Sequence, residues 1–248
     1  MSNNTSSPST VLTVSILGGL FFLFGFVTWL NGALVPYLQL ICDLTETQAL
    51  LVASSFYIAY VVMALPMSFV LDKIGLKQGM VLGLALMSVG LLLFIPAALG
   101  QTFALFLLAQ FVLGSGLTIL QTASNPYLVI SGPNESAAAR IAVMGILNKA
   151  AGVLAPLLFT ALVLSGFSDV NQASLSLLSD TERQFQIGQL AEQMVIPYLG
   201  LASIVMLLAL GMASSPLSAL VIPKDAQSSR SLFDFPHLVL GVIALFFY

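Results

Sequence analysis

Charge, cysteine and histidine are all scarce in this chain. Only 7% of its 248 residues are Asp, Glu, Lys or Arg, whereas 58% are hydrophobic, and it holds one Cys and one His. So little charge cannot cover the surface of a soluble domain. A single cysteine excludes a disulfide within the chain, and a single histidine excludes a site built on several histidines. The net charge of −3 does not bear on nucleic acid binding, but no basic patch suggests it, so we expect no nucleic acid partner. We therefore predict an all-α polytopic membrane protein in a lipid bilayer.

Six apolar runs are long enough to cross a bilayer, which takes about 20 residues. Residues 1–10 precede them and lack the features of a signal peptide, so we expect a disordered cytoplasmic tail there. We predict a six-helix transmembrane bundle over 11–222 and a cytoplasmic loop over 223–235, and the expected helices are 11–40, 48–71, 78–99, 103–130, 138–165 and 194–222. Residues 236–248 begin a seventh apolar run that stops before it could cross. The sequence is thus expected to be the N-terminal part of a longer chain.

Lys and Arg are distributed unevenly over the expected loops. The loops on one side hold five of them, which are Lys73, Lys77, Arg140, Lys224 and Arg230. The opposite side holds only Arg183. Cytoplasmic loops carry the excess of basic residues, so we expect the N-terminus in the cytoplasm, for example at a bacterial inner membrane.

The loop at 166–193 would then lie on the outer side of the membrane. Its apolar residues recur near the helical period in LLSDTERQFQIGQLAEQM. This spacing predicts a short surface helix that begins with Ser179 or Asp180 as its N-cap.

A polar stripe interrupts the fourth apolar run. Thr118, Gln121, Thr122 and Asn125 follow the spacing i, i+3, i+4 and i+7, so they share one helical face. Unsatisfied amides are costly in hydrocarbon, and the stripe must therefore face other helices or a watery cavity. Pro126 follows the stripe and removes one backbone donor. A solute pathway lined by this helix is the leading interpretation.

The first and fourth runs share a faint internal similarity. The first contains NGALVPYL and the fourth contains TASNPYLV, so each places Asn a few residues before Pro-Tyr-Leu. Two triplets of helices with opposite topology would make these runs partners in an inverted repeat. Pro197-Tyr198-Leu199 occurs where the repeat does not predict it, so chance is the alternative.

A charged motif separates the second and third runs. SFVLDKIGLKQG contains D-K-x-G-x-K, formed by Asp72, Lys73, Gly75 and Lys77. It resembles the loop signature between the second and third helices of the major facilitator superfamily, with Ser68 where the usual form has Gly. Gly75 permits a tight turn, and Asp72 could pair with the end of a neighbouring helix. An ordinary charged loop is the alternative.

Four further stretches resemble one family within that superfamily. They are FLFGFVTWLNGALVP, SSFYIAYVVMALP, LQTASNPYLVISGPNESAAAR and GILNKAAGVLAP. They look like the fucose/glucose/galactose permease family, and most like its glucose/galactose and N-acetylglucosamine branch. The resemblance implies the major facilitator fold, in which two six-helix bundles hold the substrate between them at midplane. This chain would be the N-terminal bundle, with its 3+3 inverted repeat, and a C-terminal half would be missing.

The chain departs from the proton-coupled, fucose-carrying branch of that family at the acidic positions. Gly32 stands where that branch has an acidic residue, and Gln121 stands where it has a glutamate. Asn148 matches an asparagine of its sugar site, while Gly145 replaces a nearby glutamine. The resemblance therefore implies the fold and part of the site, but not the carboxylate proton chemistry.

Lys149 is the one charge deep within the expected helices, roughly 15 Å from the cytoplasmic end of its helix. No Asp or Glu lies in the six runs. A charge at that depth costs about 2.5–3.5 kcal/mol on the insertion scale. We expect Lys149 to line a central cavity, either donating to sugar hydroxyls or serving cation coupling. Snorkelling, or a bond to helix carbonyls, is the alternative.

Sugar hydroxyls both donate and accept hydrogen bonds, as amides do. The candidate substrate-binding residues are Gln121, Asn125, Asn148, Asn31 and Trp29, with Tyr57 and Tyr60 as weaker candidates. An aromatic plane such as Trp29 covers the C–H face of a sugar ring. Asn125 could instead satisfy the backbone freed by Pro126, and Trp29 could be an interfacial belt residue.

These observations favour a secondary active sugar transporter that works by alternating access and is not an enzyme. A hexose such as glucose or galactose, or N-acetylglucosamine, is the expected substrate. We expect no cofactor apart from a coupling cation. Sodium is favoured because neutral oxygens can coordinate it, with the proton as the alternative; which residues would ligate a metal ion is unknown. The rivals are a proton-coupled carrier of fucose or another sugar, and a non-transporting six-helix scaffold or intramembrane enzyme.

Overall fold

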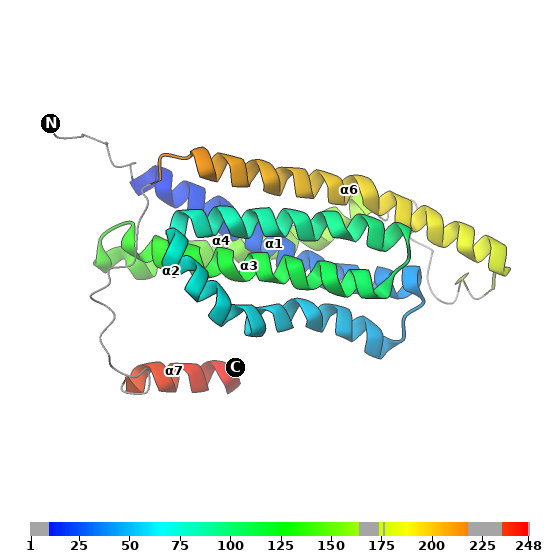
Figure 1. Cartoon of the computed structure of the whole chain (residues 1–248), viewed down its shortest axis with the longest axis horizontal. Coiled ribbons are helices and arrows are strands. Elements are labelled where there is room, and N and C mark those ends of the chain that lie inside the picture. The colour runs from blue at the N-terminus through cyan, green and yellow to red at the C-terminus, as the bar shows by residue number, and fades with distance from the viewer. Residues whose placement is uncertain (1–9, 164–173, 176, 218–234, 248) are drawn as a thin grey trace.

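The computed structural model describes residues 10–163, 174–175, 177–217 and 235–247. Its elements are α1 (Thr10–Cys42), α2 (Glu46–Leu99), α3 (Phe103–Ile130), the 3-10 turn η1 (Asn134–Ser136), α4 (Ala137–Val163), α6 (Asp180–Ser214) and α7 (Pro236–Phe247). Helices α1 to α6 run side by side in a bundle (Figure 1). Five of these helices are long and apolar enough to cross a membrane. The predicted all-α membrane fold is confirmed for the part of the chain that the structure describes.

Helix α2 reverses direction at Gly75 and so supplies two crossings (Figure 1). Gly75 has φ 80° and ψ 168°, a conformation that only glycine adopts without a large steric cost. The two arms, residues 46–74 and 76–99, correspond to the predicted runs 48–71 and 78–99. The Thr45 side chain accepts from the Gln48 backbone and caps the first arm. The described part of the bundle therefore contains six crossings, which are α1, the two arms of α2, α3, α4 and α6.

The packing of the helices follows a two-fold pattern. The first arm of α2 meets α3, where Ser55 Oγ donates to the Leu107 carbonyl at 2.8 Å. Helix α1 meets α4 in the same way, and the second arm of α2 meets α6, where Ser88 Oγ donates to the Ala202 carbonyl at 2.9 Å. If the first three crossings are exchanged with the last three, these contacts map onto one another. That is the pattern an inverted repeat produces.

The α3–α4 junction is held by one buried arginine. Arg140 donates to the Leu128, Val129 and Pro133 carbonyls and to Ser136 Oγ. The first two carbonyls belong to the last turn of α3, where helix carbonyls lack internal donors. Among the described residues the guanidinium has no carboxylate partner, and it stabilises this turn through carbonyls and one hydroxyl.

Helix α6 corrects one predicted boundary. It begins at Asp180 and ends at Ser214, instead of covering 194–222. Ser179 is its N-cap, as predicted, and forms a capping box with Glu182. However, the expected short surface helix is the first part of α6, because the capped polar turns continue into the apolar run without a break. Residues 215–217 are not helical, and 218–222 lie outside the described residues.

Some predicted segments extend beyond the residues that the structure describes. Three predicted segments lie largely or partly outside the described residues: 1–9 of the tail at 1–10, 164–165 of the fifth run, and 223–234 of the loop at 223–235. Thr10, the last residue of the predicted tail, is instead the first residue of α1. Helix α7 matches the expected start of a seventh apolar run.

The described residues that flank the expected basic loops lie at one end of the bundle. The start of α1, the turn at Gly75, the α3–α4 junction and the end of α6 lie together at the left in Figure 1. There, Lys77 Nζ donates to the Ser215 carbonyl at the end of α6 at 2.8 Å. At the other end, Arg183 pairs with Asp43 at 2.7 Å. The alternation of ends agrees with the predicted order of crossings.

Candidate functional site

A polar cavity of about 460 Å³ lies among α1, the first arm of α2, α3 and α4. Its lining residues come from these four helices and are Thr28, Trp29, Gly32, Tyr57, Tyr60, Gln121, Asn148 and Lys149. Four of the residues singled out from sequence, Trp29, Gln121, Asn148 and Lys149, thus meet at one place, and so do the two weaker tyrosine candidates. Amides, hydroxyls, an ammonium and aromatic rings together favour a polar ligand with both donors and acceptors.

Lys149 lies beside the one tryptophan. Its Nζ is 5.9 Å from the centroid of the Trp29 ring, within the range of a cation–π contact. Trp29 is 48% exposed, and its ring packs on Gly152 of α4, where a Cβ would come within 2.6 Å of the indole nitrogen. Since α4 contributes both Gly152 and Lys149, it positions the ring and the cation together.

Asn148 connects the cavity to the α1–α4 contact. Its Nδ2 donates to the Phe21 carbonyl at 3.2 Å, which uses one of the four hydrogen-bonding positions of the amide. The backbones also meet here, because a Cβ on Gly25 would lie 1.9 Å from the Asn148 carbonyl oxygen. Asn148 is therefore held in place by α1 while it lines the cavity.

The polar stripe of α3 divides into side chains with different partners. Thr118 and Thr122 donate to carbonyls one turn earlier on their own helix, at 2.8 and 2.7 Å. Gln121 lines the cavity, and its side-chain amide makes no hydrogen bond to the described residues, although its backbone carbonyl accepts from Ser124 Oγ at 3.5 Å. Asn125, one turn further on, is exposed and does not line the cavity. Gln121 is thus the member of the stripe that is free to meet a ligand in the cavity.

Asn31 lies two residues after Trp29 on α1, but its side chain does not line the polar cavity. It is only 6% exposed, it is not among the lining residues, and its Nδ2 has no partner among the described residues. Successive residues of an α-helix are about 100° apart, so Trp29 and Asn31, two positions apart, point to nearly opposite sides of α1.

The cavity lining carries no carboxylate among the described residues. Gly32 and Gln121, the two positions where the resemblance implies acidic residues in the proton-coupled branch, both line the cavity. A Cβ on Gly32 would meet nothing within 4 Å, so the space beside it is open. The described residues also contain no group of three or more His, Cys, Asp or Glu that could hold a metal ion.

Thr28 and Gly32 are lining residues that the sequence reasoning did not assign to the site. A further amide, Gln110, was not considered at all. It is 0% exposed, and neither its Oε1 nor its Nε2 has a partner among the described residues. The sequence did contain a sign of Gln110, because an amide side chain within the apolar run 103–130 is unusual. The motif residues lie apart from the cavity lining: Asp72 and Lys73 are exposed, and Lys77 contacts the end of α6.

Residues 17–170 match the family model described as Major Facilitator Superfamily. The chain is 37% identical over 238 residues to a protein named glucose/galactose transporter from Brucella abortus, covering 92% of this chain and 53% of that protein. It is 30% identical over 228 residues to the L-fucose-proton symporter of Escherichia coli, covering 92% of this chain and 52% of that one.

A solved structure gives the same assignment. The chain matches the crystal structure of the major facilitator transporter FucP in its outward conformation, with a TM-score of 0.77 and 29% identity over 95% of this chain and 56% of that one. The relatives are named as transporters and not as enzymes, and this chain spans about half their length. The fold, its helical pairing and these matches agree: the chain belongs to the Major Facilitator Superfamily.

Proposed function

We propose that this chain forms the N-terminal half of a secondary active sugar transporter. The observation that carries the proposal is the cavity in which Gln121, Asn148, Lys149 and Trp29 meet from three helices. The names of the relatives, a glucose/galactose transporter and a fucose symporter, point to the same class of substrate. The site residues and their roles are part of this proposal.

The lining matches the surface of a hexose. Gln121 and Asn148 offer amide donors and acceptors for hydroxyls, Lys149 offers a charged donor, and Trp29 offers an aromatic plane for the C–H face of the ring. Asn31 and Asn125 lie outside this lining in the described conformation, so we place the first contacts with sugar at the other four residues.

The cavity borders an exposed apolar face of α4. Ile146, Val153 and Leu157 lie on the face of α4 that includes Lys149, and all three are exposed. An exposed apolar face beside a polar cavity fits a second bundle that closes the site. Alternating access would then be a movement of the two bundles about this cavity, with the N-terminus on the cytoplasmic side.

Cation coupling is the finer part of the proposal. The described lining offers amides and hydroxyls, but no carboxylate to carry a proton. This composition supports sodium, which neutral oxygens can coordinate. The proton is the alternative because the relatives from Escherichia coli and Haemophilus influenzae are named L-fucose-proton symporters.

The test is uptake by the full-length protein in proteoliposomes. Labelled glucose, galactose, N-acetylglucosamine and fucose are offered under an imposed sodium gradient at fixed pH, and then under a pH gradient without sodium. Accumulation under the sodium gradient supports the neutral site. Accumulation under the pH gradient alone overturns sodium coupling but retains sugar transport, and no uptake of any sugar overturns both.

Gln121 and Gln110 give a matched pair of variants for the same assay. Both are glutamines of α3, but only Gln121 lines the cavity. Gln121→Leu removes about one hydrogen bond to the sugar, worth about 1 kcal/mol, so we expect the apparent affinity to fall roughly fivefold to tenfold. Gln110→Leu should leave the affinity unchanged. Equal affinities in the two variants would remove Gln121 from the site.

A further inference from the structure

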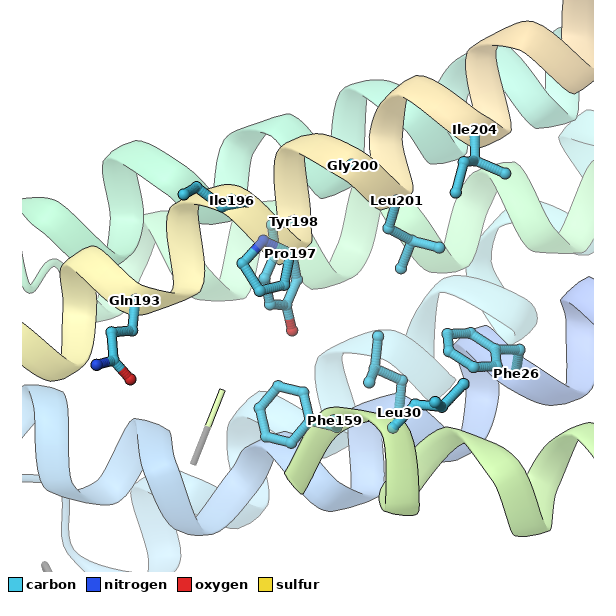
Figure 2. A pocket seen from close by; sticks show the side chains of 11 residues that line it. Phe26, Leu30, Phe159, Gln193, Ile196, Pro197, Tyr198, Gly200, Leu201 and Ile204 are labelled. Carbon is cyan, nitrogen blue, oxygen red and sulfur yellow. The ribbon is translucent and has the colours of Figure 1, made fainter. Parts of the chain in front are cut away.

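A second cavity lies apart from the polar one and shares none of its described lining residues. It has a volume of about 580 Å³ and is formed by α1, α4 and α6. Figure 2 shows its walls, with Phe26 and Leu30 from α1, Phe159 from α4, and Leu201 and Ile204 from α6. We call it the α6 groove. Nearly all its described lining is apolar, so it cannot serve a sugar or an ion.

The groove follows α6 from its polar end into its apolar part. Residues 180–193 of α6 contain all its charged residues, and a mostly apolar run of about 20 residues follows, the length that crosses the hydrocarbon core. Gln193, the last residue before that run, carries the one amide among the described lining residues and lies at one end of the groove (Figure 2). The groove therefore has its polar end at the membrane boundary and its apolar length in the hydrocarbon.

The same end also lacks one backbone donor. Pro197 lies inside α6 and has no N–H, so the carbonyl of Gln193, four residues earlier, lacks the donor that a regular α-helix would supply from position 197. An acceptor without a donor is costly where water is scarce. A ligand that brings a donor to the membrane boundary and an apolar chain below it would satisfy both parts of the groove.

The groove is open on the side that faces the bilayer. Ile196 is 81% exposed, and Ile204 is also exposed, so lipid can reach the lining from the membrane. Gly200 lies between them, and a Cβ there would meet nothing within 4 Å. The small residue leaves room at the middle of the groove, where a larger side chain would occupy it.

We propose that the α6 groove binds one acyl chain of a membrane phospholipid. The chain lies along Gly200, Leu201 and Ile204, and the ester and headgroup region lies at Gln193. A headgroup with hydrogen-bond donors, such as that of phosphatidylethanolamine or phosphatidylglycerol, can donate to the Gln193 side-chain oxygen or to the Gln193 carbonyl. The proposal is independent of the sugar and of the coupling ion, because it uses neither the polar cavity nor a gradient.

Photolabelling of the full-length protein tests this proposal. The protein is reconstituted in vesicles of phosphatidylethanolamine and phosphatidylglycerol that contain a phospholipid with a diazirine on one acyl chain. After illumination, mass spectrometry locates the labelled residues. We expect labels concentrated on Leu30, Phe159 and Leu201. Labels spread evenly over lipid-facing residues such as Leu207 and Leu210, or no label in the groove because a second bundle or a second copy covers it, would overturn the proposal.

Two glycines of α6 provide the matched variants. Gly200→Leu places a side chain in the groove, whereas Gly211→Leu makes the same change on the same helix outside it, and neither Cβ meets an atom within 4 Å. We expect groove labelling to fall severalfold in Gly200→Leu and to stay at the wild-type level in Gly211→Leu. Ile204→Trp is a second way to fill the groove if Gly200→Leu does not fold. Unchanged labelling in a folded filled-groove variant would contradict the proposal.

Discussion

Gln110 is the residue whose burial is hardest to reconcile with its chemistry. It is fully buried in α3, and neither polar atom of its amide has a partner among the described residues. An unsatisfied buried amide costs about 1–3 kcal/mol, and an apolar side chain of the same shape avoids that cost. We predict that Gln110→Leu raises the melting temperature of the detergent-solubilised full-length protein. A lower melting temperature would show that a bound water satisfies the amide in the native state.

Substitution of Lys149 tests whether sugar uptake requires a positive charge in the polar cavity. Lys149 lines the cavity, and its ammonium lies 5.9 Å from the centroid of the Trp29 ring. A hydrogen bond from a charged group is worth about 1.5–3 kcal/mol, so we predict that Lys149→Ala lowers the initial rate of sugar uptake by about tenfold or more. Lys149→Arg keeps the charge and should retain part of the rate. Full uptake and coupling by the alanine variant would reduce Lys149 to a structural role.

Single residues also show where prediction from the sequence ends. Polar side chains within apolar runs pointed to Gln121, Asn148 and Lys149, because such residues are costly unless they face a cavity or another helix. Trp29 was expected there as an aromatic plane for the C–H face of a sugar. Which face of α1 meets that cavity depends on packing, so Trp29 and Asn31 could not be separated beforehand. Thr28 and Gly32 line the cavity only because of their place on α1, and neither has chemistry that would single it out.

At the scale of the helices, the contact between α1 and α4 fixes the cavity. The two backbones approach at Gly25, where a Cβ would lie 1.9 Å from the Asn148 carbonyl oxygen and 2.7 Å from its carbon. Both of those atoms belong to backbone, which cannot rotate away, so a methyl group there must push the helices apart.

We therefore predict that Gly25→Ala lowers both the melting temperature and sugar uptake. Overpacking of this kind costs about 1–3 kcal/mol, and the movement displaces Asn148 and Lys149. Gly19→Ala is the control, because it lies on the same helix and its Cβ would meet nothing within 4 Å. Helix propensity favours alanine there, so its melting temperature should be unchanged or higher. A Gly25→Ala protein that matched Gly19→Ala in both measurements would contradict the prediction.

The boundaries of the helices were predictable where apolar runs end in polar loops. Helix α1 and α3 agree closely with the runs at 11–40 and 103–130. Helix α6 was predicted to start too late, because its capped polar turns lie before the apolar run and hydropathy does not include them. The reversal at Gly75 was expected from the glycine in a charged motif, and the positive φ gives the reason.

For the whole molecule, the sidedness of the bundle remains a prediction from its basic loops. Lys73 lies at the end of the bundle expected in the cytoplasm, and Asp180 lies at the other end. In a Cys42→Ser background, we predict that an impermeant maleimide applied to intact cells labels Asp180→Cys at once. Lys73→Cys should be labelled only after the membrane is permeabilised. The opposite labelling pattern would invert the orientation and place the Gly75 turn outside.

The pairing of helices also has a consequence for the order in which the chain can assemble. Both arms of α2 pack on α3, which follows them directly in the sequence, so residues 46–130 can associate soon after they are synthesised. Helix α1 is made first, yet its main partner is α4, which ends only at Val163. During synthesis, α1 therefore lies in the bilayer without its main packing partner while α2 and α3 associate beside it. The α1–α4 pair, and the polar cavity that it helps to form, can therefore be completed only after α4 has been synthesised.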